Sequence, residues 1–216
     1  MARGRFITLE GGEGVGKSTQ ARRLAERLGA GGREVVVTRE PGGSPGAEAI
    51  RELLVHGPVE RWSPVSETLL MYAARRDHIE RVIAPALARG AWVVCDRFLD
   101  STRAYQGAGG GAPAELIAAL ERAVVGEVTP DLTLVLDMPS DQGLERAGRR
   151  GEAARFEAKG AAFHARLREA FLAIAAREPE RCRVLDAGGD VETVAARIWA
   201  ALAERLPDAD PGSAHG

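Results

Sequence analysis

A glycine-rich segment near the amino terminus restricts the fold of this chain more than any other feature. Residues 11–18 fit the pattern G-x-x-x-x-G-K-[ST], which cradles phosphate groups. An apolar run at 6–9 precedes the segment, and apolar residues recur at helical spacing from Ala21 to Leu28 after it. A strand, a glycine-rich loop and a helix N-terminus together form an anion site. This order therefore predicts a β-α unit that binds a nucleoside triphosphate.

The residues of the loop have distinct expected roles. Glycine lets the backbone turn and bring its N–H groups against phosphate oxygens, while Lys17 supplies a cation and Ser18 a hydroxyl for Mg²⁺. A glycine-rich turn with an unrelated lysine is the alternative, and the flanking strand and helix disfavour it. The predicted nucleotide-binding residues are Gly11, Gly12, Glu13, Gly14, Val15, Gly16, Lys17 and Ser18.

Length and composition exclude several classes of protein. The 216 residues suit one α/β domain, with two smaller domains as the alternative. A net charge of −2 lacks the basic field of a general nucleic-acid binder, and no apolar stretch reaches the roughly 18–20 residues that span a bilayer. The first residues lack the apolar segment of a secretory signal. We therefore expect a soluble, cytoplasmic protein without nucleic-acid or membrane partners.

Apolar, β-branched runs alternate with helical patterns along the chain. The runs that predict strands lie at about 5–10, 34–38, 91–95, 132–136 and 182–186, and the helical patterns at 67–89, 114–125, 160–177 and 191–205. This alternation predicts one α/β domain over residues 1–206, with a five-stranded, mostly parallel sheet, helices on both faces, and ligands beyond the carboxyl ends of the strands. Residues 207–216 are rich in Pro, Asp, Gly and Ser, which predicts a frayed tail.

Cys95 and Cys182 both fall in predicted strands and show no C-x-x-C spacing. We expect them to be buried, reduced core residues, with a disulfide or a metal site as the alternative.

Several residues outside the loop suit phosphate chemistry. Asp96 follows an apolar run, where a carboxylate holds Mg²⁺ directly or through water. Arg51, Arg75 and Arg97 are candidates to grip the phosphate of a monophosphate acceptor, although each alone is more often a surface residue. The chain contains no asparagine, so the Asn-Lys-x-Asp element that reads guanine in many GTPases is absent.

An arginine-rich stretch interrupts the helical pattern at 146–155. A solvated charge run is one interpretation. The other interpretation, for a triphosphate-binding protein, is a lid at about 146–160 whose guanidinium closes over the γ-phosphate. Such a cation would stabilise the transfer, because phosphoryl transfer spreads negative charge over the γ-phosphate oxygens.

Separated motifs, in order, make the chain resemble the bacterial thymidylate kinases, which are P-loop nucleoside monophosphate kinases. The resemblance runs from about Arg5 to Leu206. It rests on EGGEGVGKSTQ at 10–20, TREPGG at 38–43, YAAR at 72–75, DRF at 96–98, STRAYQG at 101–107, PDLT at 130–133 and RFE at 155–157. The resemblance implies a three-layer P-loop kinase fold and the reaction ATP + dTMP → ADP + dTDP with Mg²⁺. It also implies a homodimer.

The resemblance also implies roles for individual residues. Lys17 would hold the β- and γ-phosphates of ATP, Thr19 would lie against the α-phosphate, and Ser18 with Asp96 would serve Mg²⁺. Arg97 and Arg51 would hold the dTMP phosphate. The remaining residues expected around dTMP are Glu13, Glu40, Met71, Tyr72, Arg75, Ser101, Thr102, Tyr105 and Gln106.

Within that set, Arg75, Thr102 and Gln106 would contact the edge of thymine, and Tyr105 would lie beside the sugar, with an ordinary half-buried tyrosine as the alternative. Glu13 and Glu40 would lie near the sugar hydroxyl and near the acceptor phosphate or metal, or would simply stabilise their loops.

The chain departs from the family pattern at two positions. Met71 stands where the family commonly has a phenylalanine that stacks on thymine, and Tyr72 would compensate. Gly14 stands where some thymidylate kinases carry a catalytic arginine, so the lid would supply the cation. The candidates for this cation are Arg149, Arg150 and Arg155, of which Arg155 is the best match.

Two other functions stay open at this stage. One is a kinase of the same fold that acts on dUMP, another monophosphate or a nucleoside. The other is a regulator that binds ATP without turnover.

Overall fold

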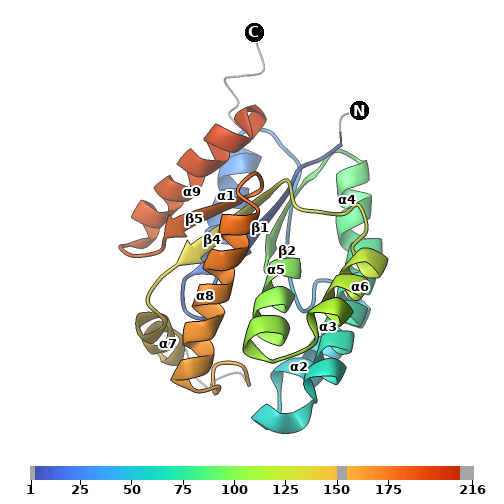
Figure 1. Ribbon diagram of the computed structural model, residues 1–216. Helices are drawn as coiled ribbons and strands as arrows, with labels where there is room; N and C mark the ends of the chain where they lie inside the picture. The colour runs from blue at the N-terminus through green and yellow to red at the C-terminus, as the bar shows by residue number, and fades with distance from the viewer. Residues whose placement is uncertain (1–2, 150–154, 210–216) are drawn as a thin grey trace.

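The structure is a computed structural model that describes residues 3–149 and 155–209. Its centre is a parallel sheet of five strands in the order β2-β3-β1-β4-β5 (Figure 1). The strands are β1 Phe6–Glu10, β2 Val35–Arg39, β3 Trp92–Asp96, β4 Leu132–Asp137 and β5 Cys182–Asp186. The predicted α/β fold is confirmed, and each strand lies within one residue of its expected bounds.

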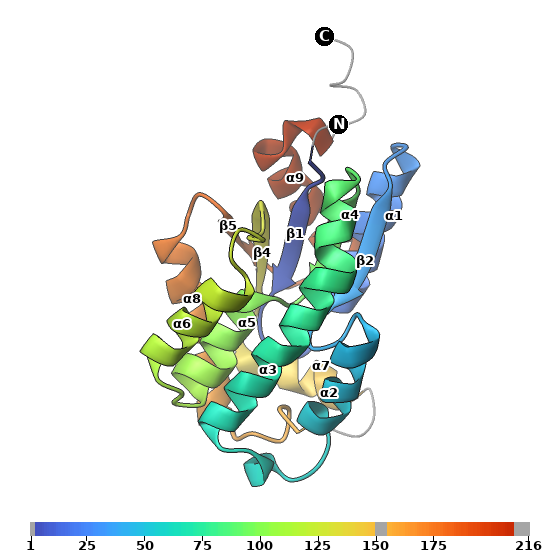
Figure 2. The same ribbon diagram turned by 90° about the vertical axis from the view of Figure 1, so that its right-hand side faces the viewer.

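Helices occupy both faces of this sheet (Figure 2). They are α1 Lys17–Ala30, α2 Pro45–Val55, α3 Pro64–His78, α4 Ala84–Ala88, α5 Leu99–Thr102, α6 Ala114–Val124, α7 Ser140–Gly148, α8 Ala161–Arg177 and α9 Val191–Arg205. Single 3-10 turns form at Val59–Arg61 and Pro207–Ala209, and π-helical turns form at Ile79–Ile83 and Arg103–Gly109.

The alternation of side chains along β1 divides the core between the two faces. Ile7 and Leu9 pack with α1 and α9 in one cluster. Phe6 points to the other face. There it packs with residues of α3, α4 and α6, while α8 packs beside β4 and β5 in a third cluster. Burial on both sides explains why β1, β3 and β4 read as continuous apolar runs rather than as alternating ones.

The register of the strands brings their polar carboxyl ends to one edge of the sheet. Asp96 at the end of β3 lies opposite Leu9 of β1 and opposite Arg39 of β2. Glu10, the last residue of β1, follows directly at this edge. Three charged residues far apart in the sequence therefore meet where the phosphate loop begins, as expected for a parallel α/β sheet.

Helix boundaries differ from the sequence pattern in ways with local causes. The helix predicted at 67–89 begins at Pro64, because the Ser63 hydroxyl caps it by accepting from the Ser66 N–H at 3.2 Å, and it passes through the π turn at Ile79–Ile83 into α4. The helical pattern did not include α2, and it also missed α5 with its π turn and α7, which are short and rich in polar residues.

The predicted tail is partly ordered. Residues Pro207–Ala209 form a turn in which Ala209 is buried, and the Asp208 carboxylate accepts from Arg5 Nε at 3.0 Å. The remaining residues, 210–216, lie outside the described part of the chain.

Both cysteines are free and buried, as predicted. Burial raises the pKa of the Cys95 thiol, and it raises that of Cys182 to about 11. Across residues 3–149 and 155–209, no helix combines the length and apolar character needed to cross a bilayer.

Candidate active site

The phosphate loop closes between β1 and α1 through three glycines in the left-handed region. The φ angles of Gly11, Gly14 and Gly16 are 129°, 71° and 92°, values that side chains with a Cβ rarely adopt. α1 begins at Lys17, whose Nζ donates to the carbonyl of Gly12 at 2.5 Å. Burial and the nearby charge of Arg97 together lower the pKa of Lys17 to about 8. The lysine is thus a desolvated cation folded over the loop.

Gly14 lies in close contact with α7. A Cβ on Gly14 would lie 1.8 Å from the Gly143 carbonyl oxygen, and a Cβ on Gly143 would lie 2.4 Å from the Glu13 carbonyl oxygen. The two glycines therefore let the phosphate loop and α7 approach with backbone against backbone. No side chain fits at position 14 unless α7 moves, which explains in steric terms why this loop carries no arginine there.

Ser18 and Asp96 lie together at the mouth of the loop. The Ser18 hydroxyl donates to the Asp96 carboxylate. The other carboxylate oxygen, Asp96 Oδ1, is buried and has no hydrogen-bond partner among the described residues. A hydroxyl and a carboxylate with an unused oxygen match the oxygen ligands that Mg²⁺ takes in nucleotide sites.

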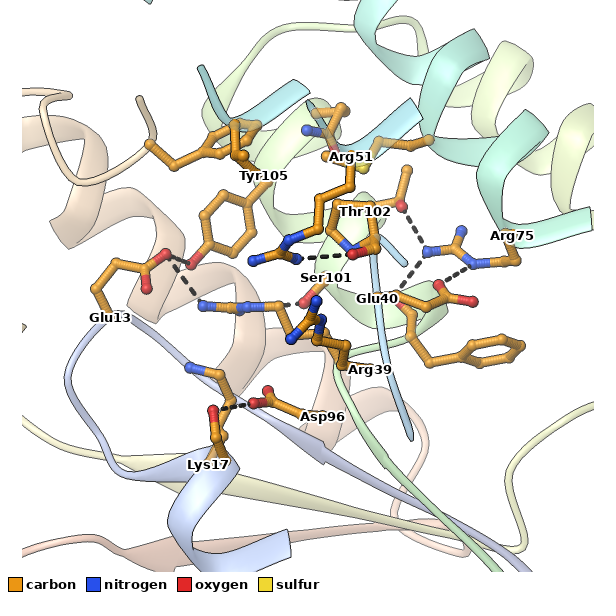
Figure 3. A pocket seen from close by; sticks show the side chains of 18 of the residues that line it. Glu13, Lys17, Arg39, Glu40, Arg51, Arg75, Asp96, Ser101, Thr102 and Tyr105 are labelled. Carbon is orange, nitrogen blue, oxygen red and sulfur yellow. Dashed lines mark hydrogen bonds and ion pairs between the residues drawn. The ribbon is translucent and has the colours of Figure 1, made fainter. Parts of the chain in front are cut away.

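Arg97 adopts an unusual backbone conformation, with φ 72°, that directs its guanidinium over the loop. Its Nη1 donates to the Gly11 carbonyl at 2.9 Å and to Ser101 Oγ at 3.2 Å, and its Nη2 donates to Glu13 at 3.1 Å. The Tyr105 hydroxyl donates to the same Glu13 oxygen at 2.6 Å (Figure 3). Burial opposes the charge of Glu13, but Arg97 and Lys17 outweigh it and lower its pKa to about 2.

A second carboxylate, that of Glu10, holds the backbone that follows Arg97. Glu10 is fully buried and accepts from Phe98 N at 2.8 Å, from Ser101 N at 3.2 Å and from Ser101 Oγ at 2.6 Å. Burial and the nearby Asp100 raise the pKa of Glu10 to about 7. Sequence reasoning missed this role, and the only signal was an acidic residue at the end of an apolar strand.

The guanidinium of Arg75 is held rigidly on three sides. Its Nε donates to Glu40 at 2.7 Å and its Nη2 to Thr102 Oγ1 at 3.0 Å (Figure 3). Nη2 also donates to the Phe98 carbonyl at 3.0 Å. Its Nη1 is buried without a hydrogen-bond partner in the described residues. Gln106 donates from Nε2 to Glu67 at 2.8 Å. These contacts hold the Arg75 guanidinium in one orientation.

These groups line a cavity of about 410 Å³. The predicted residues on its wall are Glu13, Gly14, Gly16, Lys17, Ser18, Glu40, Arg51, Met71, Arg75, Asp96, Arg97, Ser101, Thr102, Tyr105 and Gln106. Arg51 reaches it from α2 and donates from Nη1 to the Pro41 carbonyl at 2.7 Å. Arg39, Phe156 and Glu157 also line the wall and were not predicted as site residues.

Other predicted residues lie elsewhere. Gly11, Gly12 and Val15 line a small cavity behind the loop. Thr19 lies in the first turn of α1, away from the wall of the larger cavity as described. Tyr72 is a core residue whose ring lies 4.9 Å from the Arg75 guanidinium, and it is absent from the described wall of the cavity, so it does not compensate for Met71.

The lid arginines do not gather at the phosphate loop. Arg155 is buried and donates from Nε to the Leu54 carbonyl at 2.9 Å, from Nη1 to the Val59 carbonyl at 2.7 Å, and from Nη2 to Glu67. All three nitrogens are thus engaged away from the loop, in contrast to the expected lid cation. Arg149 is exposed at the end of α7 and pairs with Glu145 at 2.5 Å, and Arg150 lies outside the described residues.

Comparisons with known proteins agree with this geometry. A family model described as thymidylate kinase matches residues 9–198. A thymidylate kinase of Caulobacter vibrioides is 68% identical over 206 residues, which cover 95% of this chain and 99% of that protein. One of Nitrobacter winogradskyi is 56% identical over 211 residues, or 96% of this chain and 92% of that protein. The crystal structure of thymidylate kinase from Ehrlichia chaffeensis superimposes with a TM-score of 0.76 at 35% identity and covers 93% of this chain and 99% of that one. Sequence, fold and site agree, and the chain belongs to the thymidylate kinase family.

Proposed function

We propose that this chain transfers the γ-phosphoryl group of ATP to dTMP and releases ADP and dTDP. One observation carries the proposal. A single cavity is lined at one end by Lys17 and Ser18 of the phosphate loop, and at the other by Arg75, whose guanidinium is held in place by Glu40 and Thr102. A triphosphate at the loop and a nucleobase at Arg75 would then face each other across one space.

Arg97 lies between these two ends and is the proposed clamp for the acceptor phosphate. Its N–H groups now donate to a backbone carbonyl, to Ser101 and to Glu13. A bound phosphate would accept from the same N–H groups, either in place of these partners or beside them. Arg51 on α2 is the proposed second cation. Phosphoryl transfer requires little covalent chemistry from the protein, so holding the two phosphates in line supplies most of the catalysis.

Ser18 and Asp96 would hold Mg²⁺, directly or through water, and the unpaired Asp96 oxygen supports this assignment. When bound, the metal neutralises charge on the phosphates during transfer. Thr19 is the proposed contact to the α-phosphate. We further propose that Arg149, which is exposed, supplies the lid cation in place of Arg155.

We also propose a homodimer and a cytoplasmic location. Leu53 on α2, with Val65 and Leu69 on the adjacent α3, are large apolar side chains left exposed. Two buried, free cysteines suit a reducing compartment. Light scattering of the purified protein tests the dimer, since a monomeric mass at micromolar concentration would contradict it.

The decisive experiment measures ADP release with ATP and Mg²⁺ in the presence of dTMP, dUMP, dCMP, dGMP or UMP. We expect strong preference for dTMP, weak turnover of dUMP, and loss of activity on chelation that added Mg²⁺ restores. Preference for another acceptor would replace the substrate assignment but keep the phosphate chemistry. Tight ATP binding without any turnover would indicate the regulator and reject the kinase.

A further inference from the structure

A buried carboxylate that belongs to neither the phosphate site nor the predicted base site lies behind Gln106. Glu67 is 4% exposed on α3, and its two oxygens accept from different elements. Oε1 accepts from Gln106 Nε2 at 2.8 Å, and Oε2 accepts from Arg155 Nη2. Glu67 precedes Met71 and Arg75 by four and eight residues, so all three lie on one face of α3.

These contacts determine which way the Gln106 amide faces. Arg155 has only donors, and an ionised carboxylate has only acceptors. Glu67 can therefore accept only the NH₂ group of the amide. The amide oxygen must turn to the opposite side, and Gln106 lines the cavity. Its wall thus gains a hydrogen-bond acceptor, and the same wall includes Arg75, the proposed donor to the base.

This pair of groups distinguishes the two pyrimidines. Thymine presents an acceptor at O4 and an N–H donor at N3, whereas cytosine presents an amino donor at C4 and an acceptor at N3. A donor from Arg75 beside an acceptor from Gln106 matches thymine. Against cytosine, the same pair places donor against donor and acceptor against acceptor.

We propose that Glu67 is a positioning residue for base selection: it locks the Gln106 amide with its oxygen toward the base, so that dTMP is accepted and dCMP is rejected. The inference rests on the proposed function, because it concerns the same acceptor site. It also gives Arg155 a role different from catalysis, since this arginine holds the second oxygen of Glu67.

The variant Glu67→Gln tests the proposal with almost no change in shape. Its side-chain oxygen would turn to Arg155, which only donates, and its NH₂ group would turn to Gln106. The Gln106 amide would then have to reverse and present NH₂ to the base. We expect kcat/KM for dTMP to fall by roughly 10- to 100-fold, while that for dCMP holds or rises, because one buried pair becomes mismatched.

Two further variants separate this mechanism from a merely structural role. In a Gln106→Leu background, Glu67→Gln should no longer change the ratio of dTMP to dCMP turnover, because there is no amide to reverse. Glu67→Asp keeps an acceptor facing Gln106 and should retain the wild-type preference even if overall activity drops. It also serves as the test if Glu67→Gln does not fold, as judged by circular dichroism.

Specific results overturn the proposal. If Glu67→Gln leaves the ratio of dTMP to dCMP turnover unchanged, whether or not both activities drop, Glu67 only supports the fold. A shift of the ratio in the Gln106→Leu background would show that Glu67 does not act through the amide, and loss of selectivity in Glu67→Asp would exclude the acceptor argument. If the wild-type protein itself does not prefer dTMP, the proposed function fails instead, so the two failures are distinguishable.

Discussion

Alanine substitutions at three glycines of the phosphate loop should separate backbone strain from close packing. Gly12 is outside the left-handed region, and a Cβ there would have no neighbour within 4 Å in the described residues. Gly16 has φ 92° and equally open surroundings there. Gly14 has φ 71°, and its Cβ would lie 1.8 Å from the Gly143 oxygen and 3.1 Å from the Ala147 nitrogen. Gly12→Ala should thus carry neither cost, Gly16→Ala the backbone strain alone, and Gly14→Ala both the strain and the steric contact.

The expected free energies follow from these contacts. A residue with a Cβ in the left-handed region costs about 1–2 kcal/mol. Because alanine restricts the unfolded chain more than glycine does, any Gly→Ala change also adds about 0.4–1 kcal/mol to the free energy of unfolding. Forcing α7 away from the loop costs a further ~1–3 kcal/mol. We therefore expect Gly12→Ala to be neutral or slightly stabilising, Gly16→Ala to lose about 1 kcal/mol, and Gly14→Ala to lose about 2–4 kcal/mol.

Urea denaturation without nucleotide measures these differences, because bound nucleotide would stabilise the folded state by mass action. Gly12→Ala is the matched control within the same loop. If Gly14→Ala and Gly16→Ala lose the same free energy, the contact between the loop and α7 contributes nothing. If Gly12→Ala is as destabilising as either, the reasoning from φ and steric contact is refuted.

Four other predictions concern the site. Met71→Phe should tighten dTMP binding by about 0.5–1.5 kcal/mol through ring stacking, and calorimetry that finds equal or weaker affinity would contradict it. Arg155→Ala should lower the free energy of unfolding by about 3–5 kcal/mol, because it leaves the Glu67 charge buried and unpaired. Arg149→Ala should leave stability within about 0.5 kcal/mol and lower kcat by roughly 10²–10³-fold, and a change in KM alone would reject its proposed role. Burial raises the pKa of Glu10 from 4.5 to about 7, so the folded state binds this proton more tightly than the unfolded state. Stability should therefore fall as the pH rises from about 4.5 to about 7, by on the order of 3 kcal/mol, and a slope that persists in Glu10→Gln would assign it to another group.

Local rules were enough to predict the strands and the phosphate loop. Their apolar runs and the glycine-lysine pattern depend on neighbours within a few residues, and the structure places each strand within one residue of its prediction. The short α5, its π turn and α7 were missed because they have few apolar positions and take their stability from packing on the loop and on α8.

The base pocket was only partly accessible from sequence. The resemblance supplied Arg75, Thr102 and Gln106, and all three line the cavity. It did not supply Glu67, because nothing in a helical pattern shows that a charged residue is buried. The orientation of the Gln106 amide depends on that carboxylate, which lies 39 residues away in the sequence.

The sequence by itself determined that the chain forms a parallel α/β sheet and presents a phosphate-binding loop, since both follow from local periodicity and from the conformations open to glycine. Only the tertiary structure decided which partner each charged group found. Arg155 has donors that suit a phosphate and a carboxylate equally well, and folding brings it to a buried carboxylate 88 residues away rather than to the phosphate loop. A charge removed from water must take the nearest acceptor that folding provides, and no local pattern specifies which acceptor that is.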